Sequence, residues 1–234
     1  MQIYAHRGAS GAFPENTMEA FQWAIDLGVD GIETDVRCTS DGVPILSHDR
    51  TLLRAFGLDR DVQSLTHAEL RACAPWVPTL EELLTLAGSR VHLDIEIKQT
   101  GIERAVLRVL DAYHSSRWAI SCFDWTVLEA CRTMSPSASL WLLTESSTPD
   151  LWTTSERLAA SGIAVSASAI QPKIAPKAHD RGLTVMAWTV NDPTEGKTLR
   201  SRGVDAICTD FPEQWTRDRP AGAISDPHKT AQAD

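Results

Sequence analysis

The feature that most limits the fold is a regular alternation of strand-like and helix-like segments along the chain. From Val91 onward, six short apolar runs have strand character, at 91–98, 118–122, 138–143, 163–167, 183–189 and 204–209. Helical patterns separate them at 102–115, 124–134, 150–161, 173–182 and 193–202. Residues 2–6 and 30–36 are two earlier strand candidates with a helical pattern between them. Eight strands separated by helices predict a (β/α)8 barrel, and a doubly wound parallel sheet is the alternative.

Motif content and length favour a single barrel domain. The sequence has no Gly-x-Gly-x-x-Gly run and no complete phosphate-binding Gly-x-x-x-x-Gly-Lys-Thr motif, since Gly196-Lys197-Thr198 has Asn191 in place of the first glycine; either motif would favour the doubly wound sheet. A chain of 234 residues with 43% hydrophobic content can bury one large core. We therefore expect one barrel domain over residues 1–217. Residues 218–234 contain Pro220, Gly222 and Pro227 without apolar periodicity, and we expect them to be disordered.

Several expected helices begin with capping signatures. The spacing of a capping box occurs in three pairs, which are Asn16 with Glu19, Thr66 with Glu69, and Thr79 with Glu82. Asp124 and Asp192 are expected N-caps, and Pro193 suits a first helical position. Gly88 is the expected stop of the Leu-rich helix that Thr79 opens.

Composition excludes several classes of function. The net charge of −9 argues against non-specific binding of nucleic acid or anionic lipid. The five cysteines are widely spaced and form no Cys-x-x-Cys pair, so neither a disulfide framework nor a zinc site is indicated. The sequence contains neither an apolar run of about 18 residues, the length of a membrane span, nor a signal-peptide pattern at Met1. We expect a soluble, cytoplasmic protein without a transmembrane segment, and no sequence feature fixes its oligomeric state.

Two carboxylates occupy alternate positions of the strand expected at residues 30–36. Ile32 and Val36 alternate with Glu33 and Asp35, so a strand would point both carboxylates to one face. Two acids on one face of a buried strand repel each other, and the cost is tolerable only if a cation or a protonated partner lies between them. This pattern favours a divalent metal site, and the alternative is an edge strand with a solvated acidic face.

The strand expected at 91–98 has a charged face as well. Its apolar residues alternate with His92, Asp94, Glu96 and Lys98. In a barrel the apolar face meets the helices, so the charged face points inward, with Glu96 and Lys98 nearest the C-terminal rim where such barrels hold their active sites. The alternative is a buried structural plug of paired charges. Reactive residues at other strand ends favour a site, namely His6, Arg7, Glu33, Asp35, Trp188, Asn191, Thr209 and Asp210.

These residues together suit a phosphate ester bound beside a metal. Three acids, Glu33, Asp35 and Glu96, supply the hard oxygen ligands that Mg²⁺ or Ca²⁺ prefers. His6 and His48 could instead ligate iron, manganese or zinc with one carboxylate. If the acids hold the metal, the two histidines are free to act as general base and general acid near neutral pH. A positive pocket for phosphate oxygens would then contain Arg7 and Lys98.

A series of ordered motifs runs from residue 3 to about residue 213. They are His6-Arg7-Gly8, Glu15-Asn16-Thr17, Glu33-Thr34-Asp35, His48-Asp49, Ile95-Glu96-Ile97-Lys98, Trp188-Thr189-Val190-Asn191, and Gly203-Val204-Asp205 through Thr209-Asp210. In these motifs the chain resembles the glycerophosphodiester phosphodiesterase family. The resemblance implies a (β/α)8 barrel with a short insertion at residues 50–78, after the second strand.

The resemblance also implies a role for each site residue. It makes Glu33, Asp35 and Glu96 the ligands of one divalent cation, Mg²⁺ or Ca²⁺, and His6 and His48 the acid-base pair. Contacts to the phosphate fall to Arg7 and Lys98, and Trp188 would pack against the glycerol moiety. The implied reaction is hydrolysis of a small glycerophosphodiester to glycerol 3-phosphate and an alcohol, with either water or the glycerol 2-hydroxyl attacking first. The alternatives are cleavage of lysophospholipids as a lysophospholipase D and a non-catalytic barrel that binds phosphate ligands.

Overall fold

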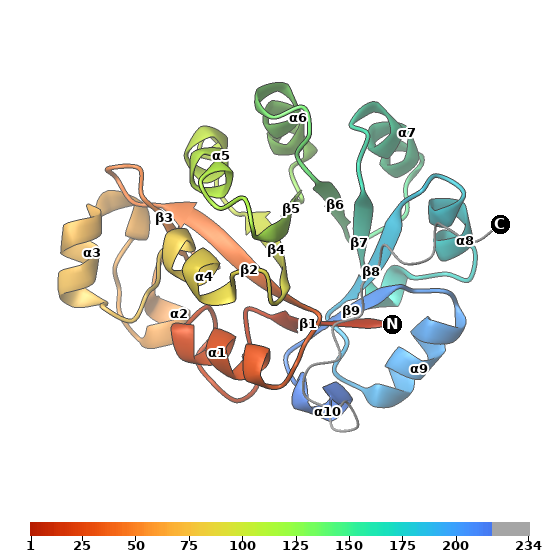
Figure 1. The fold of residues 1–234 in the computed structure, drawn as a ribbon, viewed down its shortest axis with the longest axis horizontal. Helices are drawn as coiled ribbons and strands as arrows, with labels where there is room; N and C mark the ends of the chain where they lie inside the picture. Colours follow the sequence, from red (N-terminus) through yellow and green to blue (C-terminus); the bar gives the residue numbers. More distant parts are fainter. Residues whose placement is uncertain (217–234) are drawn as a thin grey trace.

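Eight parallel strands close into a barrel in the computed structural model, which describes residues 1–216 (Figure 1). In sheet order from the N-terminal strand, the barrel consists of β1 (Gln2–His6), β9 (Ala206–Thr209), β8 (Thr184–Trp188), β7 (Gly162–Ser166), β6 (Leu140–Thr144), β5 (Arg117–Cys122), β4 (His92–Ile97) and β2 (Gly31–Cys38). Pairing of β1 with β2 closes the ring, and the short β3 (Pro44–Leu46) lies antiparallel against β2. The closed ring confirms the predicted barrel, so the doubly wound alternative is wrong.

Helices surround the barrel and connect its strands (Figure 1). They are α1 (Met18–Asp26), α4 (Leu80–Ala87), α5 (Glu103–Asp111), α6 (Trp125–Met134), α7 (Pro149–Arg157), α8 (Ile174–His179), α9 (Pro193–Ser201) and α10 (Glu213–Thr216), with a 3-10 turn η2 (Ala167–Ala169) after β7. Thr79 forms the predicted capping box of α4, and Asp124 and Asp192 cap α6 and α9 as predicted. Gly88 ends α4 with a positive φ of 55°, a conformation that glycine adopts readily.

The first helix corrects one prediction. Its N-cap is Thr17, whose hydroxyl accepts from the backbone N–H of Ala20 at 3.3 Å, so Asn16 is not the cap. Asn16 has a φ of 55° and directs its side chain toward the barrel instead. A left-handed conformation is tolerated by Asn better than by most residues, because its short polar side chain bonds locally.

Apolar side chains fill two layers. The larger layer lies between the barrel and its helices and contains the alternate positions of each strand, such as Leu93, Ile95 and Ile97 of β4. A smaller cluster lies inside the ring and includes Tyr4 and Trp141. The inward face of β4 therefore carries the charged residues that the alternation predicted. Inside the ring, the aromatic side chains of Tyr4 and Trp141 pack in the smaller cluster.

The chain leaves the barrel between β3 and α4. This part contains α2 (Leu53–Phe56), a 3-10 turn η1 (Val62–Ser64) and α3 (His67–Cys73), whose N-terminus carries the predicted capping box of Thr66 and Glu69. A small apolar cluster of its own holds it together, made of Ile45, Leu52, Val62, Leu70, Ala74 and Val77. The segment thus has independent packing beside the barrel rim, where β3 ends.

Two sequence predictions concern other parts of the molecule. Residues 218–234, expected to be disordered, lie outside the described residues. Across residues 1–216, none of the helices combines the length and the apolar character that a bilayer crossing requires.

Candidate active site

Strand register brings three acids together at the C-terminal rim of the barrel. In the pairing of β2 with β4, Asp35 lies opposite Glu96, and in that of β1 with β2, His6 lies opposite Glu33. Because side chains alternate along a strand, Glu33 and Asp35 share the inward face of β2. One oxygen of each of Glu33, Asp35 and Glu96 lies within 4.8 Å of the other two. The acids that the sequence predicted as metal ligands therefore form one cluster.

This cluster carries more negative charge than its neighbours neutralise. Burial raises the pKa of Glu33 well above its usual value, and the charges of Asp35 and Glu96 raise it further. Burial and Asp35 also raise the pKa of Glu96, although Lys98 opposes the change. Within residues 1–216, Oδ1 of Asp35 accepts no hydrogen bond. Buried, closely spaced carboxylates with an unused oxygen fit a hard divalent cation.

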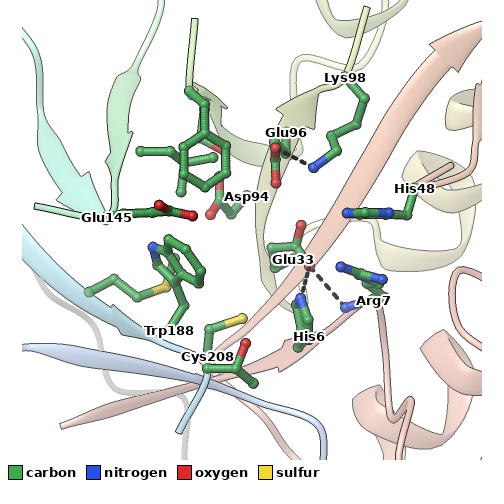
Figure 2. A pocket seen from close by; sticks show the side chains of 15 residues that line it. His6, Arg7, Glu33, His48, Asp94, Glu96, Lys98, Glu145, Trp188 and Cys208 are labelled. Atoms are coloured by element: carbon green, nitrogen blue, oxygen red, sulfur yellow. Dashed lines mark hydrogen bonds and ion pairs between the residues drawn. The ribbon is translucent and has the colours of Figure 1, made fainter. Parts of the chain in front are cut away.

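Two cations border the acidic cluster. The guanidinium Nε of Arg7 lies 3.2 Å from Oδ2 of Asp35, and the backbone N–H of Arg7 donates to Glu33 at 3.0 Å. The ammonium of Lys98 donates to Glu96 at 2.7 Å and lies 3.6 Å from Asp35. Both side chains line the same cavity as the histidines (Figure 2). The side chains of Arg7 and Lys98 therefore place positive charge at the edge of the acidic cluster.

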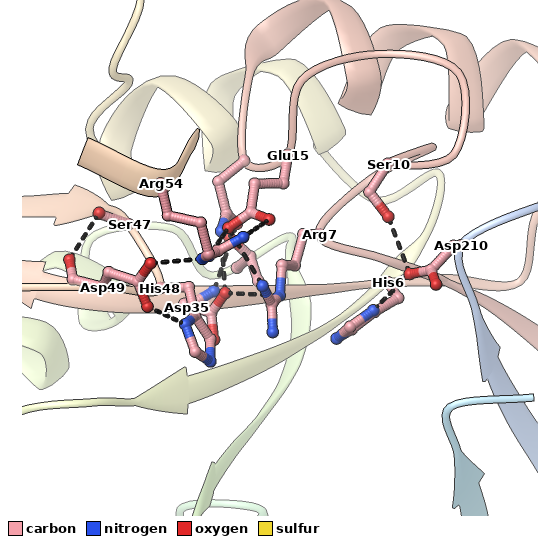
Figure 3. Close-up of polar contacts among 12 residues, drawn as sticks. His6, Arg7, Ser10, Glu15, Asp35, Ser47, His48, Asp49, Arg54 and Asp210 are labelled. Carbon is pink, nitrogen blue, oxygen red and sulfur yellow. Dashed lines mark hydrogen bonds and ion pairs between the residues drawn. The ribbon is translucent and has the colours of Figure 1, made fainter. Parts of the chain in front are cut away.

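His6 is held by Asp210, which follows β9. Nδ1 of His6 lies 2.6 Å from Oδ1 of Asp210, while Nε2 lies 3.9 Å from Glu33 (Figure 3). Burial alone would raise the pKa of Asp210, but hydrogen bonds from His6, Asn191 and Ser10 lower it to about 2. An ionised carboxylate only accepts hydrogen bonds, so Nδ1 of His6 must carry a proton. Nε2 is the nitrogen that faces the cavity.

His48 is held in the same way by its own neighbour in the sequence. Nδ1 of His48 lies 2.6 Å from Oδ1 of Asp49, whose pKa is lowered because hydrogen bonds from His48 and Arg54 outweigh the effect of burial. Burial lowers the pKa of His48 itself, because the imidazolium form is poorly solvated there. Because Nδ1 contacts Asp49, Nε2 is the ring nitrogen of His48 that remains for the cavity. The imidazoles of His6 and His48 thus lie beside the acid cluster in the same arrangement, each bound through Nδ1 to an aspartate.

The far side of the cavity is mainly aromatic and aliphatic. The cavity has a volume of about 260 Å³, and Trp188 and Phe123 meet edge to face in its wall with ring centroids 5.4 Å apart. Glu145, at the end of β6, points into the same space (Figure 2). Within residues 1–216 the indole Nε1 of Trp188 has no hydrogen-bond partner, although it is buried. The cavity therefore has one charged side and one mainly aromatic side, on which Glu145 is a charged residue.

The structure brings the sequence-predicted residues together. The cavity is lined by His6, Arg7, Glu33, His48, Glu96, Lys98 and Trp188. Asp35 lies directly behind this lining, fully buried between Arg7 and Lys98.

Sequence reasoning did not assign the residues that hold these side chains in place. Asn16 donates to Asp35 at 2.8 Å and accepts from the hydroxyl of Thr34 at 2.8 Å, and Glu15 accepts from Arg7 at 3.1 Å. The motif Glu15-Asn16-Thr17 is visible in the sequence, but it gave Glu15 no role and gave Asn16 only a helix-capping role, which is wrong. Arg54 and Glu145 carried no signal, because each lies in a segment without periodicity.

Comparisons with known proteins agree with this geometry. Residues 6–214 match the glycerophosphoryl diester phosphodiesterase family. The chain is 34% identical to the uncharacterized protein YqiK of Bacillus subtilis, covering 91% of this chain and 96% of that protein. It is 31% identical to a glycerophosphodiester phosphodiesterase of Caldanaerobacter subterraneus, covering 90% and 94%. A solved phosphodiesterase of Oleispira antarctica, in complex with the product sn-glycerol-3-phosphate, superposes with a TM-score of 0.85 at 26% identity, covering 93% and 97%.

Proposed function

The chain belongs to the glycerophosphoryl diester phosphodiesterase family, and we propose that it hydrolyses glycerophosphodiesters to glycerol 3-phosphate and an alcohol with the help of a divalent cation. One observation carries the proposal. Three buried carboxylates converge within 4.8 Å at a cavity that two imidazoles and two cationic side chains also line. A phosphodiester is the substrate whose charge and shape suit such a surrounding, because it needs charge neutralisation and two proton transfers.

Glu33, Asp35 and Glu96 would hold the cation, which is Mg²⁺ or Ca²⁺ on the chemistry of three carboxylates. When bound, such an ion supplies charge stabilisation for phosphoryl oxygens as a Lewis acid. Asn16 donates to Asp35 and so orients this carboxylate toward the cluster.

Arg7 and Lys98 bind the phosphate. Arg7 already uses its backbone N–H and part of its guanidinium on Glu33, Asp35 and Glu15, so its position is fixed before substrate arrives. Lys98 is held by Glu96 and remains at the cavity wall. Groups positioned in advance stabilise developing negative charge without reorganising during the reaction.

His6 and His48 transfer the protons. Each donates its Nδ1 hydrogen to an aspartate, so each keeps Nε2 for the reaction. One imidazole removes the proton from the attacking hydroxyl, and the other gives a proton to the departing alkoxide oxygen. The attacking oxygen forms the new P–O bond, the electron pair of the broken P–O bond leaves with the alcohol oxygen, and the transferred proton makes that oxygen a hydroxyl group.

Trp188 packs against the glycerol moiety. Its indole and Phe123 form an apolar wall of the cavity. Carbon-rich faces of a polyol pack on aromatic rings, while its hydroxyls need donors and acceptors.

The test is hydrolysis of glycerophosphocholine with detection of glycerol 3-phosphate. We expect product in the presence of Mg²⁺ or Ca²⁺, loss of activity after chelation, and recovery when either ion is returned. The matched substrate is lysophosphatidylcholine, and faster release of choline from it would instead support a lysophospholipase D. Absence of turnover on both, with glycerol 3-phosphate still bound, would support a phosphate-binding barrel. Activity unchanged by chelation would contradict the cation.

A further inference from the structure

Arg54 contacts two acids from outside the barrel. It lies on α2, in the segment between β3 and α4, and its side chain is 50% exposed. Its Nε donates to Oδ2 of Asp49 at 2.5 Å, and its two terminal nitrogens donate to both oxygens of Glu15 at 2.8 and 2.6 Å. One guanidinium thus bridges two carboxylates that come from different loops of the barrel (Figure 3).

Each of these acids has a second partner inside the site. The other oxygen of Asp49 accepts from Nδ1 of His48 at 2.6 Å. Oε1 of Glu15 also accepts from the terminal nitrogen of Arg7 at 3.1 Å. Arg54 is therefore linked through Asp49 to His48, the proposed proton-transfer group. It is linked through Glu15 to Arg7, which the proposed function assigns to the phosphate. It does not belong to the cavity lining itself.

Only arginine fits this bridge. Its planar fork offers donors in two directions, so Nε can serve Asp49 while the terminal nitrogens hold Glu15 in a bidentate pair. Lysine presents a single point charge and would satisfy one acid at a time. Because the side chain is half exposed, the pairs themselves should add little to the stability of the fold. Their effect is on the orientation of the two acids.

We propose that Arg54 is a positioning residue that orients His48 through Asp49 and Arg7 through Glu15. The segment at residues 50–78 then contributes to the reaction by fixing the geometry of the rim. The inference rests on the proposed function, because it assigns roles to His48 and Arg7 that the hydrolysis requires. Partners that orient a reacting group from one residue away typically change activity by about 10 to 100-fold when removed.

Arg50 supplies a matched control. It is an exposed arginine four residues earlier in the same segment, and its guanidinium pairs with Asp61 at 2.7 and 2.8 Å. Neither residue of that pair lines the cavity. Arg50→Ala therefore removes the same type of side chain and a similar ion pair without touching Asp49 or Glu15.

The first test is steady-state hydrolysis of glycerophosphocholine by Arg54→Ala, Arg54→Lys and Arg50→Ala. We expect Arg54→Ala to lower kcat by about 10 to 100-fold and to raise KM, Arg54→Lys to recover part of the loss, and Arg50→Ala to match the wild type. Asp49→Asn should reduce the further loss from Arg54→Ala without abolishing it, because the effect on His48 through Asp49 is then removed while the effect on Arg7 through Glu15 remains. Equal kinetic losses for Arg54→Ala and Arg50→Ala, or full additivity with Asp49→Asn, would overturn the proposal.

The second test does not depend on turnover. Nitrogen-15 NMR of the histidine rings reports which ring nitrogen of His48 carries the proton, with the signals assigned through His48→Gln. We expect the Nδ1–H form to dominate in the wild type and in Arg50→Ala, and to lose population in Arg54→Ala and less so in Arg54→Lys. An unchanged tautomer in both Arg54 variants would overturn the inference. An inactive wild type that still shows the tautomer change would refute the proposed function while leaving the role of Arg54 standing.

Discussion

His6 donates its Nδ1 hydrogen to Asp210, a residue 204 positions later in the chain, across a distance of 2.6 Å. The two residues meet because β1 and β9 are neighbours in the closed barrel. Asp210 is itself fixed, since Asn191 donates to its second oxygen at 2.7 Å and Ser10 donates to the first at 3.0 Å. The first and last strands of the barrel thus determine which nitrogen of His6 faces the cavity.

We expect Asp210→Asn to lower kcat by about 10²-fold or more, because the amide no longer requires a proton on Nδ1 of His6. Kinetics of glycerophosphocholine hydrolysis would measure the loss. Ser10→Ala is the control, because it removes one donor to Asp210 and leaves the contact with His6 in place. A kcat of Asp210→Asn close to that of Ser10→Ala would contradict a role for the His6–Asp210 contact.

The pKa of His48 in the folded protein should lie below 6.5. Burial lowers it, and Lys98 and Arg7 lower it further, while Asp35 and Asp49 act in the opposite direction. A bound cation would also lower it, because it adds positive charge nearby. NMR titration of the imidazole measures the value directly, and Lys98→Gln should raise it. A value above 6.5 in the wild type would show that the two aspartates outweigh burial.

The lowered pKa of His48 makes the free energy of unfolding depend on pH. The unfolded chain binds a proton on His48 at higher pH than the folded protein does, so protonation favours unfolding. The contribution of His48 to stability is therefore complete above about pH 6.5 and is lost as pH falls below it. The His48→Gln variant should show a weaker decline in its free energy of unfolding over that range.

A comparison of Glu96→Gln with Asp94→Asn should show whether cation binding depends on one proposed ligand or on any carboxylate in the cavity. Both residues lie on the inward face of β4, but only Glu96 belongs to the cluster of three acids. We expect Glu96→Gln to weaken Mg²⁺ or Ca²⁺ binding by about 10-fold or more, as loss of a ligand does, and Asp94→Asn to change it far less. Burial raises the pKa of Asp94 to about 7, so this carboxyl is only partly ionised near neutral pH. Calorimetric titration with each ion measures both affinities, and equal losses would place Asp94 among the ligands.

Much of the fold could be predicted because its signals are periodic. The alternation in β4 fixed which face holds Asp94, Glu96 and Lys98, and the count of strand-helix units indicated a closed barrel. Positions at strand ends then identified the cavity, since parallel strands of a barrel all end at one rim. These inferences depend only on local patterns that repeat along the chain.

Contacts between distant, irregular segments could not be predicted in this way. Asn16 and Thr17 are both good N-cap residues, and only the tertiary contact with Asp35 explains why Thr17 caps α1. Arg54 lies on a helix of four residues without apolar periodicity, so nothing local indicates its partners Glu15 and Asp49. Such pairs depend on how a loop returns to the rim, which no spacing rule describes.

Substitutions of Asn16 should lower the stability of the fold to different extents. Its backbone is left-handed, with a φ of 55°, and its side chain bonds Asp35 and Thr34. Asn16→Ala loses both bonds and strains the backbone, whereas Asn16→Gly loses the bonds alone. We expect Asn16→Ala to be less stable than Asn16→Gly by about 1 kcal/mol in urea unfolding. The reverse order would mean that the left-handed conformation relaxes when the side chain is removed.

Asn16→Asp tests the charge at the same position. It keeps an oxygen that can accept from Thr34, but it replaces the donor to Asp35 by a second carboxylate. Without a cation this repulsion should destabilise the fold, and added Mg²⁺ or Ca²⁺ should restore more stability to this variant than to the wild type. Equal stabilisation of both proteins by the ion would place the cation away from Asp35.

The acid sensitivity of the fold should depend on Asp210. Its pKa is about 2 in the folded protein against 3.8 in an unperturbed chain, so its ionised form stabilises the folded state. Because the folded value is the lower one, this contribution is complete above about pH 4 and is lost as pH falls toward 2. Its full size is roughly 2 kcal/mol, and about half should remain at pH 3. Urea unfolding of the wild type and Asp210→Asn at pH 5 and pH 3 measures it, and we expect the stability difference to shrink at the lower pH. A difference that stays constant or grows would show that Asp210 titrates normally and that its contact with His6 does not favour the ionised carboxylate.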